Sequence, residues 1–548
     1  MTSMAALGRK ADLSGWTLSS LLIAAAMVLP IGVLLFHLFV PGGAAWDHLL
    51  GTTLGGYIWN SLALMALVAV FSCLLGVPTA WLVAATEFPG RKTLSWLLVL
   101  PLAAPAYVIA YLYTDLLDFA GPVQTWIRSS FGLMAGDYWF PQVRSLPGAA
   151  LLLGLVLYPY IYLLARNAFA TRAGVHFEAA RTLGHSPLSA FVRVALPAAR
   201  PAIAGGLALV LMETLADFGV VDYFAIPTFS TGIFRTWIAM GEKLAAMKLA
   251  AIMLVFVIAL IGFESLGRRG RFDSGTAHAK FIPMKLQGWR KWAALGFCCV
   301  PVMIGFAIPM ASLLAYTVSG GDQLLGRGFT DFLWNSVSVA IVAAIIATGL
   351  ALLLAYAQRL SDSPTTKVAI RISTLGYALP GLMLAIALLG PVGGYDRALT
   401  GFMSENFGWT GGLVLSGTTV LLVYAYVVRF LTVSFNSVSG GLATISPSMD
   451  AAARSLGETP GGVVRKIHMP LLRPSLAAAM LLVFVDVMRE LPATLILRPF
   501  NFETLATRVY RLASDERLAE ASTAALAIVL VGLLPVLLLN RVSSKAER

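Results

Sequence analysis

Long apolar runs recur along almost the whole of this 548-residue chain. A helix needs about 20 apolar residues to cross the hydrocarbon of a bilayer. About twelve runs approach that length, near residues 17–40, 58–86, 93–118, 147–169, 201–221, 246–265, 291–317, 333–357, 372–391, 411–431, 474–495 and 518–540. Only 12% of the residues are charged, against about 25% in soluble domains. We therefore predict an all-α integral membrane protein of about twelve transmembrane helices.

Two segments between these runs match each other in register. The first reads Glu-Ala-Ala-Arg-Thr-Leu-Gly over 178–184, and the second reads Ala-Ala-Ala-Arg-Ser-Leu-Gly over 451–457. Pro197 recurs as Pro470 at the same separation of 273 positions. Each glycine offers the backbone freedom that a sharp turn needs, and each alanine pair allows another surface to approach closely. We expect a protruding turn and short helix in each copy.

The duplication extends over the rest of the chain. Trp59-Asn60-Ser61 recurs as Trp334-Asn335-Ser336, a shift of 275 positions. An even number of spans in each copy gives both the same orientation, which is the parallel kind of repeat. We therefore predict two homologous six-helix halves, 1–263 and 292–548, joined by a basic linker, 264–291.

Charge predicts the orientation of the halves. The linker 264–291 carries seven Lys and Arg residues against two acidic ones, whereas 41–57 carries no Lys or Arg. Cytoplasmic loops are enriched in Lys and Arg, so the linker, both termini and both repeated loops are expected on the cytoplasmic side. This bias accounts for the net charge of +12 without nucleic acid. One stretch opposes this orientation. Counting the spans places it on the external side, yet it carries Arg498, Arg508, Arg511 and Arg517.

The repeated segment resembles the EAA loop of bacterial ABC importer permeases. The resemblance implies a type I importer fold in the bacterial inner membrane, two copies of an ATPase subunit bound at coupling loops 170–200 and 432–473, and a periplasmic binding protein. The residues that it places at the ATPase are Glu178, Ala179, Ala180, Arg181, Gly184, Pro197, Asp450, Ala451, Ala452, Ala453, Arg454, Gly457 and Pro470.

The second copy departs from this pattern at its acidic residue. Ala451 stands where the first copy has Glu178, and Asp450 precedes it, so the acidic contact is either shifted or lost. If Arg429 is the counterpart of Arg166, the segment between the preceding span and the second loop is longer than in the first copy and rich in Ser and Gly.

Two further segments narrow the resemblance. Residues 100–111 and 213–219 look like those of fused ferric-iron permeases, which implies uptake of Fe(III). Thiamine, polyamine, sulfate or phosphonate importers of similar build are the alternatives within the class. An ion-coupled secondary transporter, a channel and a structural membrane subunit are alternatives from other classes, but none of them has a reason to repeat the loop.

The chain lacks the means to hydrolyse ATP. A phosphate-binding P-loop needs Gly-Lys followed by Ser or Thr, and no Gly-Lys dipeptide occurs. ATP and Mg²⁺ are therefore expected on the partner ATPase, with no cofactor and no catalytic residue on this chain. The three cysteines lie in apolar runs, and no His-Cys spacing indicates a stable metal site.

Four carboxylates fall inside apolar runs, where charge is costly. They are Glu213, Asp217, Asp486 and Glu490. A spacing of four predicts that each pair shares one helix face. They are either weak oxygen ligands along a cation pathway or a structural network that caps backbone groups.

The many tyrosines near span ends are first interpreted as aromatic belts at the lipid interface, with a pathway role as the alternative.

Overall fold

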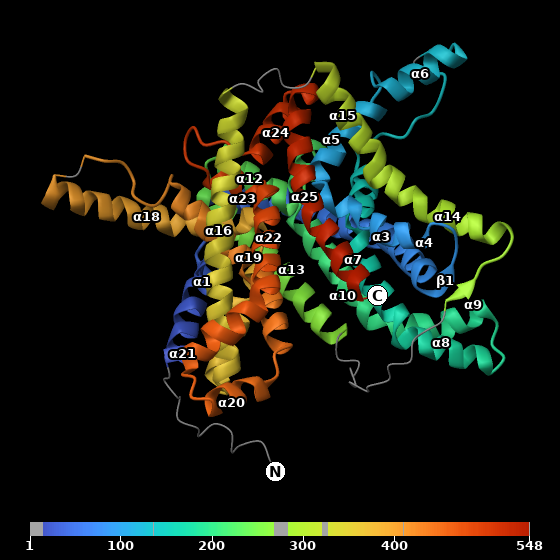
Figure 1. Ribbon diagram of the computed structural model, residues 1–548. Helices are drawn as coiled ribbons and strands as arrows, with labels where there is room; N and C mark the ends of the chain where they lie inside the picture. Colours follow the sequence, from blue (N-terminus) through green and yellow to red (C-terminus); the bar gives the residue numbers. More distant parts are fainter. Residues whose placement is uncertain (1–14, 135, 268–282, 321–326, 409, 547–548) are drawn as a thin grey trace. The chain divides into compact units, whose positions relative to one another are not determined.

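The computed structural model describes residues 15–134, 136–267, 283–320, 327–408 and 410–546 (Figure 1). Its architecture is all-α, as predicted. Among these residues, eleven helices are long and apolar enough to cross a bilayer. A twelfth span, predicted over 93–118, is instead a pair of helical segments, Arg91–Ala103 and Ala106–Phe131, bent by 90°. The bend falls at Pro105, which has no backbone N–H to continue a helix.

The helices form two compact units, and each unit includes a terminal segment of the other sequence half. One unit comprises residues 41–329 and 505–548, and the other comprises 1–40 and 330–504. We call them the first-half unit and the second-half unit, after the coupling loop that each contains. The predicted halves thus describe the sequence repeat, whereas compact packing groups the chain differently.

The first-half unit is built on α3 and α7, which pack along each other, with α10 against both. A parallel ladder of two residues per strand, Thr86 with Met284 and Glu87 with Lys285, joins the end of α3 to the residues before α14. The elements are α2 (Ala44–Thr52), α3 (Leu54–Ala85), β1 (Thr86–Glu87), α4 (Arg91–Leu97), η1 (Leu100–Ala103), α5 (Ala106–Leu117), α6 (Pro122–Phe131), α7 (Leu146–Ala170), α8 (Arg172–Thr182), α9 (Pro187–Ala190), η2 (Phe191–Ala195), α10 (Leu196–Ala216), α11 (Gly219–Tyr223), α12 (Phe229–Phe234), η3 (Arg235–Ala239), α13 (Lys243–Gly267), β2 (Met284–Lys285), α14 (Trp289–Val302), η4 (Met303–Ala307), α15 (Ile308–Gly320), α24 (Leu505–Ser514) and α25 (Leu518–Ala546).

The second-half unit is built on α19 and α22, with α1 packed against α17 and α18. The hydroxyls of Thr17 and Thr366 lie 3.0 Å apart and join α1 to α17. The elements are α1 (Gly15–Phe39), α16 (Arg327–Leu360), α17 (Pro364–Ser373), η5 (Gly376–Ala378), α18 (Gly381–Phe407), α19 (Thr419–Ala443), α20 (Pro447–Ser455), α21 (Pro460–Val463), η6 (Val464–His468), α22 (Met469–Met488) and α23 (Pro492–Leu497).

Equivalent helices repeat in register. Helices α7 and α19 are both 25 residues long, and their first residues, Leu146 and Thr419, are 273 positions apart. The prediction of a longer segment before the second loop is therefore wrong. Helix α19 continues through Ala443, and Arg429 aligns with Val156 of the first copy. Gly441 permits this packing, since a Cβ there would lie 2.1 Å from Ser475 Oγ of α22. Tertiary packing outweighs the low helix propensity of the Ser and Gly residues.

The tyrosines of α5 and α7 lie inside the first-half unit. Tyr111, Tyr158 and Tyr162 have no exposed surface. The Tyr158 hydroxyl donates to the Leu98 carbonyl at 2.8 Å. The aromatic-belt interpretation is therefore wrong for these residues, which lie in the interior of the unit.

The arginines that opposed the predicted orientation are held by local structure. Arg508 is buried in α24, Arg498 Nη1 lies 3.5 Å from Glu503, and Arg517 forms an ion pair with Glu520 at 2.5 Å. They are therefore poor markers of a cytoplasmic loop. Four basic linker residues used for the orientation, Arg268, Arg269, Arg271 and Lys280, lie outside the described residues.

Candidate functional site: the coupling loops

Each coupling helix, α8 or α20, ends at a glycine in the left-handed region. Gly184 has φ +90° and Gly457 has φ +86°. In the first copy, the N–H of His185 donates to the Ala180 carbonyl and the N–H of Gly184 to Arg181, both at 3.1 Å. The second copy repeats both bonds around Gly457. This pair of bonds is a Schellman motif, whose left-handed residue is usually glycine because other residues are strained there.

The prolines of the motif lie inside the next helix, each ten residues after the first residue of that helix, Pro187 or Pro460. A π-helical turn, Phe191–Ala195 in one copy and Val464–His468 in the other, directly precedes the Leu-Pro197 and Met-Pro470 pairs. Proline lacks an N–H and its ring clashes with the carbonyl four residues earlier, and a wider turn is one way for a helix to accommodate that clash. The chain therefore runs from the coupling loop into a span without a break.

The two loops present similar surfaces. Ala180 and Ala453 are buried against their own units, whereas Ala179, Ala451 and Ala452 are exposed. The leucines before the two glycines, Leu183 and Leu456, are 81% and 85% exposed. Glu178 is half-buried, and Arg181 and Arg454 are exposed. Each loop thus combines a small-residue face with one protruding apolar side chain.

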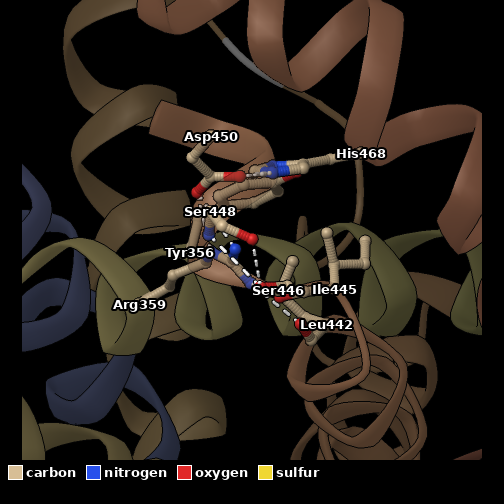
Figure 2. Close-up of polar contacts among 8 residues, drawn as sticks. All are labelled: Tyr356, Arg359, Leu442, Ile445, Ser446, Ser448, Asp450 and His468. Carbon is tan, nitrogen blue, oxygen red and sulfur yellow. Dashed lines mark hydrogen bonds and ion pairs between the residues drawn. The ribbon is translucent and has the colours of Figure 1, made fainter. Parts of the chain in front are cut away.

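The second coupling helix is attached to its unit by an ionic network (Figure 2). Asp450 Oδ1 lies 2.7 Å from His468 Nε2, and Asp450 Oδ2 accepts from Arg359 Nη2 at 3.0 Å. His468 Nδ1 lies 3.0 Å from the Tyr356 hydroxyl. The three charged or titratable side chains are at most 18% exposed. Asp450 therefore faces its own unit, and its carboxylate holds α20 to α16 and to the start of α22.

Arg359 also fixes the chain that leads into α20. Its Nη1 donates to the carbonyls of Leu442, at 2.8 Å, and Ile445, at 3.1 Å. Figure 2 shows both carbonyls below the guanidinium, with Ser446 and Ser448 between them and Asp450. The Ser446 hydroxyl accepts from the N–H of Ser448 and caps α20. One guanidinium thus binds the end of α19 and the coupling helix together.

The first coupling helix is attached at the same place by aromatic rings. The indole of Trp81 lies 4.9 Å from Phe177, 5.2 Å from Phe169 and 4.6 Å from Phe191, measured between ring centroids. In the register of the repeat, Trp81 corresponds to Tyr356 and Phe177 to Asp450. The same junction is apolar in one half and ionic in the other.

The ionic junction keeps Asp450 charged. Burial acts to raise the pKa of the Asp450 carboxyl, but the hydrogen bonds and charges of His468 and Arg359 outweigh it and lower the pKa below its ordinary value. A carboxyl with a lowered pKa stabilises the fold above its ordinary pKa and loses that contribution as the pH falls through the lowered value. The Asp450 carboxylate is therefore ionised at neutral pH, and its contribution to the junction is lost in acid.

The pathway carboxylates occupy helix ends. Helix α10 ends at Ala216, and Asp217 Oδ2 accepts from the N–H groups of Val220 and Val221, at 3.1 and 3.2 Å, at the start of α11. The prediction that Glu213 and Asp217 share a helix face is therefore wrong. A carboxylate that accepts these N–H groups ends one helix and begins the next.

The second half repeats this arrangement. Helix α22 ends at Met488, so Asp486 and Glu490 do not share a helix face either. Glu490 Oε1 accepts from the N–H of Ala493 at 3.2 Å and from Arg429 Nη1 at 2.9 Å. Asp486 forms an ion pair with Arg489. These contacts are those of a structural network, and a pathway role for the four carboxylates stays a prediction.

Sequence reasoning missed Arg359, His468 and Tyr356. The duplicated register contained a signal, because His468 replaces Ala195 and Tyr356 replaces Trp81 at otherwise similar positions. Within the described residues, no group of three or more His, Cys, Asp or Glu side chains could hold a metal ion.

Comparison with known proteins identifies relatives of the whole chain. The family model described as "Binding-protein-dependent transport system inner membrane component" matches twice, over residues 75–271 and 347–548. The Fe(3+)-transport system permease protein FbpB 2 of Haemophilus influenzae is 26% identical over 89% of this chain and 90% of its own. The putative ferric transport system permease protein FbpB 1 of the same organism is 24% identical over 83% of this chain and 71% of its own. The putative 2-aminoethylphosphonate transport system permease protein PhnV of Salmonella typhimurium is 25% identical over 44% of this chain and 91% of its own.

The ionic junction generates a prediction about stability. Asp450→Ala should lower the free energy of unfolding by about 2–4 kcal/mol, because it leaves Arg359 and His468 partly buried without their shared carboxylate. Hydrogen exchange should accelerate over residues 447–470. The matched control is Asp362→Ala, since Asp362 pairs with Lys367 on the exposed surface of the same unit. Equal behaviour of the two variants would show that the network does not hold α20.

Proposed function

Because this chain belongs to the family of binding-protein-dependent transport system inner membrane components, we propose that it is the permease subunit of an ATP-driven importer of ferric iron. The observation that supports this proposal most directly is the pair of coupling loops. Both have the same Schellman turn, the same exposed leucine and the same π turn before proline. A secondary transporter or a channel has no use for two such surfaces.

Ferric iron is the substrate that the relatives favour. The relatives that match most of the chain are named as ferric permeases, one of them over 89% of this chain. The phosphonate permease matches only 44% of it. Shared organisation over both halves supports a shared substrate better than likeness over one half.

The partners follow from the same proposal. Two copies of an ATPase bind ATP and Mg²⁺ and dock on the two coupling loops, one on each. A periplasmic binding protein delivers iron at the opposite face. Both termini and both loops are cytoplasmic, in agreement with the charge of the linker. The permease itself binds no cofactor.

The geometry gives these partners a way to drive transport. Leu183 and Leu456 protrude from small-residue surfaces, which suits insertion into a cleft of each ATPase. When ATP closes the ATPases, the coupling helices move with them. Because α8 is packed on Trp81 of α3 and α20 is bonded to Arg359 of α16, the movement passes to membrane spans. ATP binding thereby shifts the permease between two pre-existing states.

Reconstitution tests this proposal. The permease is placed, with its partner ATPase and binding protein, in liposomes that contain ATP and Mg²⁺. Ferric-loaded binding protein should stimulate ATP hydrolysis and uptake of radioactive iron, whereas the unloaded protein should do neither. Stimulation by thiamine, a polyamine, sulfate or a phosphonate in place of iron would overturn the ferric assignment.

The two glycines should be essential to coupling. A Val at position 184 or 457 costs about 1–2 kcal/mol of backbone strain in the left-handed region, although no atom beyond the local backbone and the adjacent residues lies within 4 Å of the added Cβ. Gly184→Val/Gly457→Val should therefore insert into the membrane but lose iron-stimulated ATP hydrolysis. Gly184→Asn/Gly457→Asn is the control, because Asn tolerates positive φ. Normal coupling by the Val variant would contradict this role.

The acidic residues of the two loops should act differently. Glu178→Ala should weaken binding of the ATPase, since a charge-assisted contact between subunits is lost. Asp450→Ala should first destabilise the isolated permease, because its carboxylate is bonded within the chain. The measurements are ATPase affinity and thermal unfolding of each variant. A loss of ATPase affinity by Asp450→Ala without destabilisation would mean that Asp450 contacts the ATPase.

A further inference from the structure

A group of phenols and one carboxylate meets inside the first-half unit. Helix α5 contributes Tyr107 and Tyr111, α11 contributes Asp222 and Tyr223, and α24 contributes Tyr510. The rings of Tyr111 and Tyr223 lie 4.4 Å apart, and those of Tyr107 and Tyr111 lie 5.8 Å apart. The Tyr510 hydroxyl donates to Asp222 Oδ2 at 2.7 Å. Three elements that are distant in sequence thus bring oxygen-bearing groups together.

The hydroxyl of Tyr111 is the unexplained member of this group. Its side chain is 0% exposed, and its oxygen has no hydrogen-bond partner among the described residues. Its ring packs against that of Tyr223, which adjoins Asp222 in α11, and Asp222 accepts the hydrogen bond from Tyr510. A buried hydroxyl without a partner costs about 1–3 kcal/mol, whereas the equally buried Tyr158 and Tyr162 donate to backbone carbonyls. An oxygen retained at such a cost points to a ligand.

The second half provides an internal control for this interpretation. At the positions that correspond to Tyr107, Tyr111, Asp222 and Tyr223, it has Leu382, Ile386, Leu495 and Ile496. Leu382 and Ile386 are buried in α18, the counterpart of α5. The repeated fold is therefore built with aliphatic side chains at these four positions, and the oxygens of Tyr111, Asp222 and Tyr223 serve a purpose other than packing.

We propose that Tyr111, Tyr223, Tyr510 and Asp222 form a transient binding site for Fe(III) on its way through the permease. The proposal rests on the proposed function as an iron importer. Carboxylate and phenolate oxygens are hard donors, which suit a hard cation. Each phenol gives its proton to water as its oxygen binds iron and takes a proton back when iron leaves. The oxidation state of iron does not change.

The surrounding charges suit a site that releases its ion. Arg235 Nη2 lies 3.9 Å from Asp222 Oδ1. Arg144 donates to the Tyr223 hydroxyl at 3.4 Å, and its guanidinium lies 4.9 Å from the centre of that ring. Glu516 lies 3.8 Å from Arg144 and offsets part of its charge. Two guanidinium groups beside the oxygens weaken the hold on a cation, and a transport site must bind weakly enough to let its ion go.

Tyr111→Phe is the decisive variant, because it removes one oxygen and breaks no hydrogen bond to another described residue. Iron uptake by the reconstituted complex should fall about tenfold or more, while the thermal midpoint of the permease stays the same or rises. Tyr158→Phe is the matched control. It removes the bond from Tyr158 to Leu98, so it should lower the thermal midpoint and leave uptake per folded complex unchanged.

A spectroscopic measurement on the purified permease is independent of transport. Ferric nitrilotriacetate, added in excess, should produce the visible charge-transfer absorption of iron bound to phenolate. The band should disappear in Tyr111→Phe/Tyr223→Phe and persist in Tyr158→Phe. A wild-type permease without the band, or a double variant that keeps it, overturns the site.

The uptake assay separates the two proposals. If the wild-type complex takes up iron and Tyr111→Phe takes up as much, the site is wrong and the importer function stands. If the wild-type complex takes up no iron but is stimulated by another substrate, the ferric function itself fails, and the iron site falls with it.

Discussion

The attachment of each coupling helix to its own unit is the interaction on which transport by this architecture depends. A partner that moves a coupling helix moves a membrane span only as far as that attachment is stiff. In one half, the attachment consists of Trp81 among three phenylalanines. In the other, it consists of Asp450 held by Arg359 and His468. Ring packing stabilises chiefly through buried apolar area, whereas the ionic junction acts through charge-assisted hydrogen bonds. The two coupling helices are therefore attached by different physical interactions.

Backbone chemistry explains why carboxylates are found at membrane depth. Helices α10 and α22 both stop short, and each is followed by a brief helix whose first N–H groups need acceptors. Water is scarce in such a place, so an unpaired N–H would be costly. Asp217 accepts two of these N–H groups, and Glu490 accepts one together with a guanidinium hydrogen. These hydrogen bonds give both carboxylates a structural role, whereas the Tyr111 hydroxyl has no hydrogen-bond partner among the described residues.

The fold was accessible from the sequence because apolar run length and a constant repeat spacing are strong signals. The family, confirmed by the two matches of its model, followed from the loop motif. The sequence pattern does not show which residues become neighbours in the folded protein. Asp217 lies in an apolar run but ends a helix, since N–H groups three and four residues later need it. Arg429 was paired with Arg166 by residue type, whereas helix register pairs it with Val156. The network around Asp450 joins residues 91 and 18 positions away, which no local pattern contains.

Fusion of the two halves is what permits such differences. In a permease made of two identical subunits, every residue is present in both subunits. A phenol placed at a substrate site in one subunit is therefore also present at the equivalent position of the other. Here Tyr111 corresponds to Ile386 and Asp450 to Phe177, and each half keeps only the chemistry that it uses. The common skeleton, with its Schellman turns and π turns, is the same in both copies, which suits our proposal that each loop docks on an ATPase subunit. The side chains behind it diverge, since a fused chain can place a phenol or a charged junction at one of two equivalent positions and not at the other.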